Sequence, residues 1–237
     1  MLDTRTDFRI ASYNIRKALG TDRRRDPERI MAVVAELQAD VVVLQEADLR
    51  LGVRPAALPH NQIQAHTGLT PVPLARNGVS LGWHGIAILA RPEIAVTGTV
   101  LLDLPGLEPR GAVIVDFLLK GGPLRVVGTH LGLLRSSRRK QVSQIRESLK
   151  ALPECGTVIA GDLNEFSTSV GLGRLSPVFR IHTPGRTFHA RRPFASLDRF
   201  ATNDLVDLTR TGVLQDSLTA VASDHLPIWA NGALLSA

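Results

Sequence analysis

A carboxylate and an amide follow a short apolar run in the second half of the chain. Residues 158–160 are apolar and are predicted to form a buried strand. Asp162 and Asn164 come soon after it, two residues apart. In extended backbone their side chains would point to the same side, where they could hold a water molecule and a phosphate oxygen together. The alternative is a strand that runs into an Asx-type turn, because Asp and Asn are common turn residues.

Other predicted strands also end or begin in polar residues suited to metal or phosphate chemistry. In chain order these are Asn14, Glu46, Arg110, His130, Asp198, Asp224 and His225. The carboxylates among these residues, with Asp162 and the amide oxygens, are hard ligands of the kind that Mg²⁺ prefers. No cluster of Cys and His suggests zinc. The sequence therefore predicts Mg²⁺ as the cofactor, with Mn²⁺ as a substitute.

The elements that position these residues begin with a βαβ unit. Residues 8–13 alternate as a strand does, Asp26 and Pro27 begin a helix, and residues 40–44 form a buried strand. Parallel strands joined in this way end at the same edge of a sheet, so Asn14 and Glu46 are expected to lie together there. Open α/β sheets bind their ligands at that edge.

The middle of the chain predicts further strands around an irregular segment. Residues 49–81 have little pattern, apart from one short helix expected around 56–67. Strands are predicted at 85–90, 94–102, 112–119 and 124–129. The last two form an antiparallel hairpin, with Arg110 before it and His130 just past its end.

A helix with Ser136 or Ser137 as its cap is predicted next, and three cations would fall in its first turn. Arg138, Arg139 and Lys140 would each oppose the helix dipole by ~0.3–1 kcal/mol. Helix stability therefore does not explain them, whereas a phosphate-bearing partner would. A solvated basic face is the alternative. Arg138 and Arg139 are accordingly candidate phosphate-binding residues.

The last third of the chain continues without a visible boundary. A Gly- and Ser-rich connection follows Phe166, then come a basic stretch at 186–192, a run at 196–200 and an apolar strand at 228–230. The chain contains no internal repeat, low-complexity tract or linker. One domain that spans residues 1–237 is the simplest interpretation.

Composition narrows the class of protein. The 237 residues are 44% hydrophobic and 21% charged, which is typical of a globular domain. No apolar run approaches the ~18 residues of a membrane span, and the first residues lack the apolar core of a signal peptide. Together with the single Cys155, this predicts a cytoplasmic protein, expected to be a monomer without a protein partner. The net charge of +6 favours phosphate-bearing ligands.

Six short motifs in this order resemble those of the endonuclease/exonuclease/phosphatase superfamily, and most closely small uncharacterised bacterial members. They are Tyr13-Asn14, Leu44-Gln45-Glu46, Gly128-Thr129-His130, Gly161-Asp162-Leu163-Asn164, Leu197-Asp198-Arg199 and Ser223-Asp224-His225. The resemblance covers residues 8–230 and implies the DNase I-like α/β fold. This is a four-layer α/β sandwich of two packed mixed β-sheets flanked by helices. It also implies Mg²⁺-dependent hydrolysis of phosphoesters by a metal-assisted water.

The resemblance also implies a role for each residue of the constellation. Glu46 would be the chief metal ligand, with Asn14 nearby and Asp224 completing the site. Asp162 would orient or deprotonate the attacking water. The scissile phosphate would be bound by Asn164, by His130, by His225 paired with Asp198, and by Arg110.

These roles have structural alternatives. In these alternatives Asn14 would only cap a turn and Glu46 would be a surface carboxylate. His130 and His225 would be structural residues whose hydrogen bonds are made within the protein. Arg110 would pair with Glu108, and Asp198 would only neutralise Arg199.

Departures from the family pattern limit the prediction of the substrate. Trp83-His84 stands where many relatives have an aromatic residue before Gly85, so His84 is either a substrate contact or an edge residue. Asp198-Arg199 stands where abasic-site nucleases usually carry Asp-Tyr. The Asp-Arg pair resembles that of the phosphoinositide 5-phosphatases. The residues that flank the pair in those enzymes are, however, not matched in this sequence.

Three functions fit this sequence. The first is a phosphodiesterase or nuclease acting on DNA or RNA, supported by basic clusters at 16–25, 135–140 and 186–192, each next to a motif. The second is a phosphatase or phospholipase-like hydrolase of lipid headgroups, inositol phosphates or other soluble phosphates, with membrane contact only through anionic headgroups. The third is a non-catalytic phosphate-binding module. An aromatic content of 4% argues against extensive base stacking, so a nuclease would bind mainly the backbone.

Overall fold

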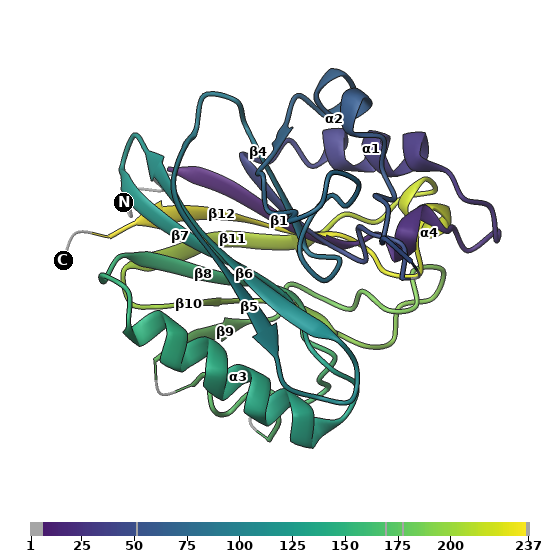
Figure 1. The fold of residues 1–237 in the computed structure, drawn as a ribbon. Coiled ribbons are helices and arrows are strands. Elements are labelled where there is room, and N and C mark those ends of the chain that lie inside the picture. The colour runs from purple at the N-terminus through teal and green to yellow at the C-terminus, as the bar shows by residue number, and fades with distance from the viewer. Residues whose placement is uncertain (1–6, 51, 169, 177, 236–237) are drawn as a thin grey trace.

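The computed structural model describes residues 7–50, 52–168, 170–176 and 178–235, which form two six-stranded β-sheets and a few helices (Figure 1). The first sheet contains, in spatial order, β11 (Val206–Val213), β12 (Ile228–Leu234), β1 (Phe8–Asn14), β2 (Val41–Gln45), β4 (Ala87–Ala90) and β3 (Thr70–Pro71). The second contains β5 (Ala95–Leu104), β6 (Arg110–Leu119), β7 (Gly122–His130), β8 (Gly156–Asp162), β10 (Asp198–Thr202) and β9 (Arg180–His182). The helices are α1 (Pro27–Glu36), α2 (His60–Thr67), α3 (Arg135–Lys150), α4 (Thr219–Ala222) and the 3-10 helix η1 (Arg16–Ala18).

Both sheets are mixed. β1 runs parallel to β2, and β7 runs parallel to β8, whereas the other neighbouring strands are antiparallel. The predicted βαβ unit and the predicted hairpin are therefore confirmed. None of the helices in the described ranges has the length and apolar character needed to cross a membrane. Residues 1–6, where we expected no signal peptide, lie outside the described ranges.

Helices cover the outer faces of the two sheets. On the first sheet, Leu44 packs in one apolar cluster with Ile30 of α1. On the second sheet, Ile159 packs in another cluster with Val142 of α3. Figure 1 shows α1 and α2 on one side of the paired sheets and α3 on the other. The order helix, sheet, sheet, helix confirms the predicted four-layer sandwich.

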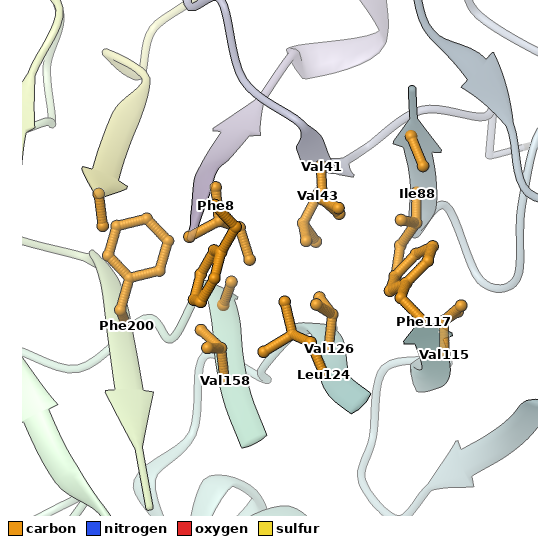
Figure 2. Close-up of a cluster of buried hydrophobic side chains, with 14 of the residues drawn as sticks. Phe8, Val41, Val43, Ile88, Val115, Phe117, Leu124, Val126, Val158 and Phe200 are labelled. Carbon is orange, nitrogen blue, oxygen red and sulfur yellow. The ribbon is translucent and has the colours of Figure 1, made fainter. Parts of the chain in front are cut away.

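The main core fills the space between the sheets. Side chains of alternate residues point into it, starting from Phe8 in β1 and from Val158 in β8, and Figure 2 shows the two rows facing each other. The same period of two carries Asn14 and Asp162 onto these inner faces, at the ends of their strands. The polar ends of the two sheets are therefore brought together by the packing of their apolar parts.

Several elements differ from the sequence-based expectation. α3 begins at Arg135, with Leu134 at its N-cap position and no side-chain cap, so the predicted serine cap is wrong. The segment at 15–25, between the first predicted strand and the first predicted helix, reads as a loop in the sequence but contains η1. β9 and β11 were not predicted; their residues are mostly half-exposed and lack a clear apolar alternation.

Candidate active site

Three neighbouring strands of the second sheet present polar residues side by side. In the strand register, His130 of β7 pairs with Asp162 of β8, and Asp198 of β10 pairs with Asp162 from the other side. Residues that are paired across adjacent strands point to the same face of a sheet. The register therefore places these three residues in one row on the inner face.

The first sheet completes this row through Asn14. Its Nδ2 donates a hydrogen bond to Asp162 Oδ2 at 3.0 Å. His130 Nε2 lies 3.4 Å and His225 Nε2 lies 3.6 Å from the same oxygen. Residues as far apart in the chain as Asn14 and His225 thus converge on one carboxylate oxygen.

His225 is paired with Asp198, as predicted. Its Nδ1 lies 2.8 Å from Asp198 Oδ2, which also accepts a hydrogen bond of 2.5 Å from Thr187 Oγ1. Burial lowers the pKa of His225, but the carboxylates of Asp198 and Asp162 outweigh it and raise the pKa to about 10. Among the described contacts, Arg199 binds Thr183 and backbone carbonyls instead of Asp198. The alternative that Asp198 only neutralises Arg199 is therefore wrong.

His130 differs from His225 in charge. Burial lowers its pKa to about 3, against the opposing effect of Asp162. Arg110 Nη1 lies 3.0 Å from His130 Nδ1, and an arginine can only donate, so this ring nitrogen accepts. The proton of the neutral ring is consequently on Nε2, which faces Asp162. Arg110 also lies 3.5 Å from Glu108, so the alternative of a local ion pair holds alongside the contact with His130.

The backbone after β8 turns instead of staying extended. Asn164 has a φ of 50°, and its N–H donates to Asp162 Oδ1 at 3.0 Å, which is the Asx turn that we gave as the alternative. The Asn164 amide donates to Leu131 O at 2.9 Å. The extended geometry predicted for this pair is therefore wrong.

Glu46 and Asp224 both contact the turn that follows β1. Lys17 Nζ forms an ion pair with Glu46, and Arg50 Nη2 lies 3.7 Å from its other oxygen. Arg16 Nε lies 3.2 Å from Asp224. Asn14 is held in the same turn, since its side-chain oxygen accepts from the N–H of Arg16. The turn-capping alternative for Asn14 is therefore also present, beside its bond to Asp162.

A cavity opens beside Glu46 and His130. Its polar wall is formed by Glu46, Asp48, Arg50, Arg54, His84, Glu108, Arg110 and His130. His84 lines it with both ring nitrogens engaged, at 2.8 Å from Asp103 and 3.3 Å from Arg54. Sequence reasoning missed Arg50 and Arg54, which lie in the segment without a pattern. The spacing of Arg50 four residues after Glu46 was the one available signal.

Three residues that line this cavity have left-handed backbone. Glu46 has a φ of 52°, Arg54 one of 55° and His84 one of 50°. Non-glycine residues rarely adopt this conformation, which costs of the order of 1–3 kcal/mol and is found mainly at functional sites. The strain agrees with a functional role for this end of the sheets.

The sequence model described as "Endonuclease/Exonuclease/phosphatase family" matches residues 11–225. The chain belongs to this family. Its members are phosphoester hydrolases and typically use a divalent metal. The matched residues contain the site from Asn14 to His225. A search of the curated proteins gave no match.

Solved structures share the fold of this family member. One from Beutenbergia cavernae DSM 12333, an endonuclease/exonuclease/phosphatase, has 23% sequence identity and a TM-score of 0.75, over 98% of this chain and 73% of that one. A Bacteroides thetaiotaomicron mannosyl-6-phosphatase has 18% identity and a TM-score of 0.77, over 96% and 100%. D. rerio TDP2, complexed with a single-strand DNA product, has 16% identity and a TM-score of 0.74, over 95% and 98%.

Two sets of side chains in this family member could hold the divalent metal. Asn14, Glu46 and Asp224 supply hard oxygen atoms around the turn after β1, and Glu46 lines the cavity. Asp162, Asp198 and His225 bring ligand atoms within 4.8 Å of one another. In the second set, however, Nδ1 of His225 is already bonded to Asp198, and both of its ring nitrogens carry protons when it is cationic. His225 would therefore have to exchange that bond and lose a proton to bind a metal, whereas the first set offers oxygen donors alone.

Arg138 has a different role from the one its sequence position suggested. It is the fourth residue of α3, not a member of the first turn, and it is buried. Its guanidinium lies 2.7 Å from Glu165 and donates to the carbonyls of Gly132 and Leu133. The charge of Arg138 is therefore balanced by Glu165, and no phosphate is needed to account for it. The phosphate-binding prediction for Arg138 thus loses its basis. Arg139 is exposed, and its side chain lies 3.5 Å from Val170 O.

Proposed function

We propose that this chain hydrolyses phosphodiester bonds of nucleic acid, with Mg²⁺ as its cofactor and Mn²⁺ able to replace it. The observation that supports the proposal most is the convergence of Asn14, His130 and His225 on one oxygen of Asp162, beside the carboxylates Glu46 and Asp224. A phosphodiester resists attack because its anionic oxygens repel the nucleophile. A site that combines a carboxylate with fixed cations and metal ligands removes this barrier.

Each residue has a task that follows from its contacts. Asn14, Glu46 and Asp224 would hold the metal ion, which supplies Lewis-acid activation of a phosphoryl oxygen when it is bound. Asp162 is fixed by Asn14 and would orient and deprotonate the attacking water. His225 is cationic beside Asp198 and would bind the phosphate oxygens as their charge develops.

Arg110 and His84 would hold the substrate from the cavity side. Arg110 reaches His130 with one nitrogen, and five N–H donors leave it able to bind a phosphate oxygen as well. His84 lies in the wall of the same cavity. Asn164 donates its amide to Leu131, so a phosphate contact by Asn164 would require that bond to exchange.

Nucleic acid is the favoured substrate because cations surround the polar end of the sheets. Residues 16–25 and 186–192 are both rich in arginine, and the two segments touch through a hydrogen bond of 2.8 Å from Arg191 to Thr21. The similar TDP2 structure contains a single-strand DNA product. A polyanionic strand along these loops would pass the Asp162 row.

A small phosphate ester is the second candidate substrate. The cavity beside Glu46 places Arg50, Arg54 and Arg110 around a confined space, which suits a compact anion. The similar Bacteroides thetaiotaomicron structure is a mannosyl-6-phosphatase. A non-catalytic binding module has less support, because the proposed catalytic residues keep their polar groups and contact one another.

An activity panel tests the proposal. Single-stranded and duplex DNA, RNA, anionic phospholipid vesicles, inositol phosphates and a soluble monophosphate ester are incubated with Mg²⁺, with Mn²⁺ or with EDTA. We expect Mg²⁺-dependent cleavage of a nucleic acid that EDTA abolishes and that His225→Ala, purified in the same way, largely lacks. Turnover of a monophosphate alone would replace the nuclease by a phosphatase. Binding of nucleic acid without turnover of any substrate would indicate a binding module.

A further inference from the structure

Two phenylalanine rings are exposed beside the candidate active site. The chain has seven phenylalanines, and Phe8, Phe117, Phe179 and Phe200 are buried. In contrast, Phe166 is 70% exposed and Phe194 is 62% exposed. Large aromatic side chains normally contribute to the core of a protein, so exposed rings beside a candidate active site indicate a surface that binds a ligand.

One buried guanidinium joins the two loops that carry these phenylalanines. Nη2 of Arg199 donates to Glu165 O at 2.8 Å, to Phe166 O at 3.3 Å and to Ser196 O at 2.8 Å. Ser196 is two residues from Phe194, and Arg199 directly follows Asp198 of the site. The loops that carry the two rings are therefore anchored to the same side chain, next to the active site.

Phe194 is linked to the active site through the ring of Phe188, and Phe166 is close to the site in the sequence. Phe194 packs edge-on against Phe188, with ring centroids 5.6 Å apart, and the ring of Phe188 lies 5.1 Å from that of His225. Phe166 lies two residues after Asn164. A group bound on these rings would consequently adjoin the phosphate that His225 is proposed to bind.

Exposed cations precede Phe194 in the same segment. Arg186, Arg191 and Arg192 are exposed. Within the described part of the chain, the side chains of Arg186 and Arg192 form neither a hydrogen bond nor an ion pair. Their charges are thus available to the phosphates of a ligand whose base lies on Phe194.

We infer that Phe166 and Phe194 form a stacking platform for the bases of a single-stranded nucleic acid, whose phosphates are bound by Arg186 and Arg192. In a duplex the faces of the bases are covered by their neighbours, so this platform requires unpaired nucleotides. The inference rests on the proposed phosphodiesterase function and narrows its substrate class. It also refines the expectation from composition, because a few aromatic residues suffice when they are placed at the site.

A cycle of protein and substrate changes tests the platform. Phe166→Ala and Phe194→Ala are compared with wild type on a single-stranded oligonucleotide and on the same strand with abasic tetrahydrofuran units in place of its nucleotides. Stacking on one ring contributes ~1–3 kcal/mol per base, so each variant should lose ~5- to ~150-fold in kcat/KM on the strand with bases. The loss should largely disappear on the abasic strand. Phe194→Trp should restore cleavage, and Leu118→Ala, which removes an exposed apolar side chain of the β6–β7 hairpin, should have no effect.

Binding measured separately distinguishes failure of the platform from failure of the proposed function. Fluorescence anisotropy with a labelled single strand in EDTA reports affinity without cleavage. Weaker binding by the alanine variants would support the platform even if wild type cleaved no oligonucleotide, a result that would refute the nuclease alone. Equal losses on abasic and normal strands would overturn the platform, as would unchanged binding. Selective loss of binding to phosphatidylserine vesicles would overturn it in favour of a lipid surface.

Discussion

Asp162 Oδ2 is the atom around which the residues of the candidate site are arranged. Asn14 fixes it from the first sheet, while a neutral His130 and a cationic His225 face it from either side. Two histidines of the same site thus differ in charge because their partners differ. Asp198 and Asp162 raise the pKa of His225, whereas burial lowers that of His130.

The first prediction concerns the pair of His225 and Asp198. His225→Ala should lower kcat by ~10²- to ~10³-fold, because it removes a fixed positive charge from the developing phosphate. Asp198→Asn should reproduce much of this loss, since Asp198 orients the ring through a bond of 2.8 Å. Steady-state kinetics of both single variants and the double variant measure the coupling. A double variant as impaired as the product of the two singles would show that the residues act independently.

The second prediction decides between the two possible sets of metal ligands. Glu46→Gln should weaken Mg²⁺ binding by more than about tenfold, because loss of an outer partner of a ligand alone already costs ~10–100-fold. Asp198→Asn is the matched control and should retain the affinity. Isothermal titration calorimetry with Mg²⁺ and Mn²⁺ gives this result without any substrate. The reverse order of affinities would place the metal among Asp162, Asp198 and His225.

At the scale of elements, one buried carboxylate links α3 to the loop that follows β8. Glu165 is fully buried and accepts from Arg138 and Arg135 of the helix and from the N–H of Ser167. Burial raises the pKa of Glu165, but these three partners outweigh it and lower the pKa from 4.5 to about 2. The network therefore holds the loop that carries both Asn164 and Phe166.

The third prediction follows from this network. Arg138→Gln would leave a buried carboxylate without its closest partner and should lower the free energy of unfolding by up to ~3–5 kcal/mol. Arg139→Gln, one residue further on an exposed position, is the control and should stay within ~0.5 kcal/mol of wild type. Urea denaturation measures both. Equal stability of the two variants would mean that the pair of Arg138 and Glu165 contributes little to stability, and would revive the phosphate-binding role of Arg138.

The same carboxylate gives a pH dependence with a defined sign. Because the pKa of Glu165 is lower in the folded chain, its contribution is fully present above about pH 4.5 and is lost as the pH falls toward 2. Glu165→Gln should therefore lose stability relative to wild type at neutral pH, with the difference shrinking between pH 4.5 and 2. Urea midpoints across this range test it, and a difference independent of pH would contradict it.

Sequence reasoning found the elements with strong periodicity and missed those positioned by tertiary contacts. β1, α1 and β2 follow directly from their apolar pattern, and six motifs located the polar ends of the strands. The Asx turn at Asn164 could not be separated from extended backbone, since the same two residues suit both. The roles of Glu165 and Phe166 depend on Arg138 and Arg199, which are distant in the sequence. No local pattern reports such contacts.

At the scale of the whole molecule, the site exists only because the two sheets pack closely at one end. Asn14 and Glu46 come from the first sheet, whereas His130 and Asp162 come from the second. The hydrogen bond from Asn14 to Asp162 spans the gap between the sheets, so the width of that gap sets the geometry of the site. Gly128 lies in β7 on the inner face, two residues before His130.

The last prediction tests this dependence by widening the gap. A Cβ atom at Gly128 would lie 2.8 Å from Val43 Cγ1 and 2.9 Å from Ile86 Cγ2, both on the opposing sheet side. Branched side chains are stiff at χ1 and cannot swing away, so the sheets would have to separate. Gly128→Ala should lower the free energy of unfolding by ~1–3 kcal/mol. It should also lower kcat/KM, because Asn14 and Asp162 would move apart.

Gly78→Ala, where a Cβ would meet nothing within 4 Å, is the control and should change neither the free energy of unfolding nor kcat/KM. Urea denaturation and kinetics on the same preparations decide: a Gly128→Ala protein that is less stable but fully active would show that the site tolerates a wider gap, and that the packing of the sheets does not set its geometry.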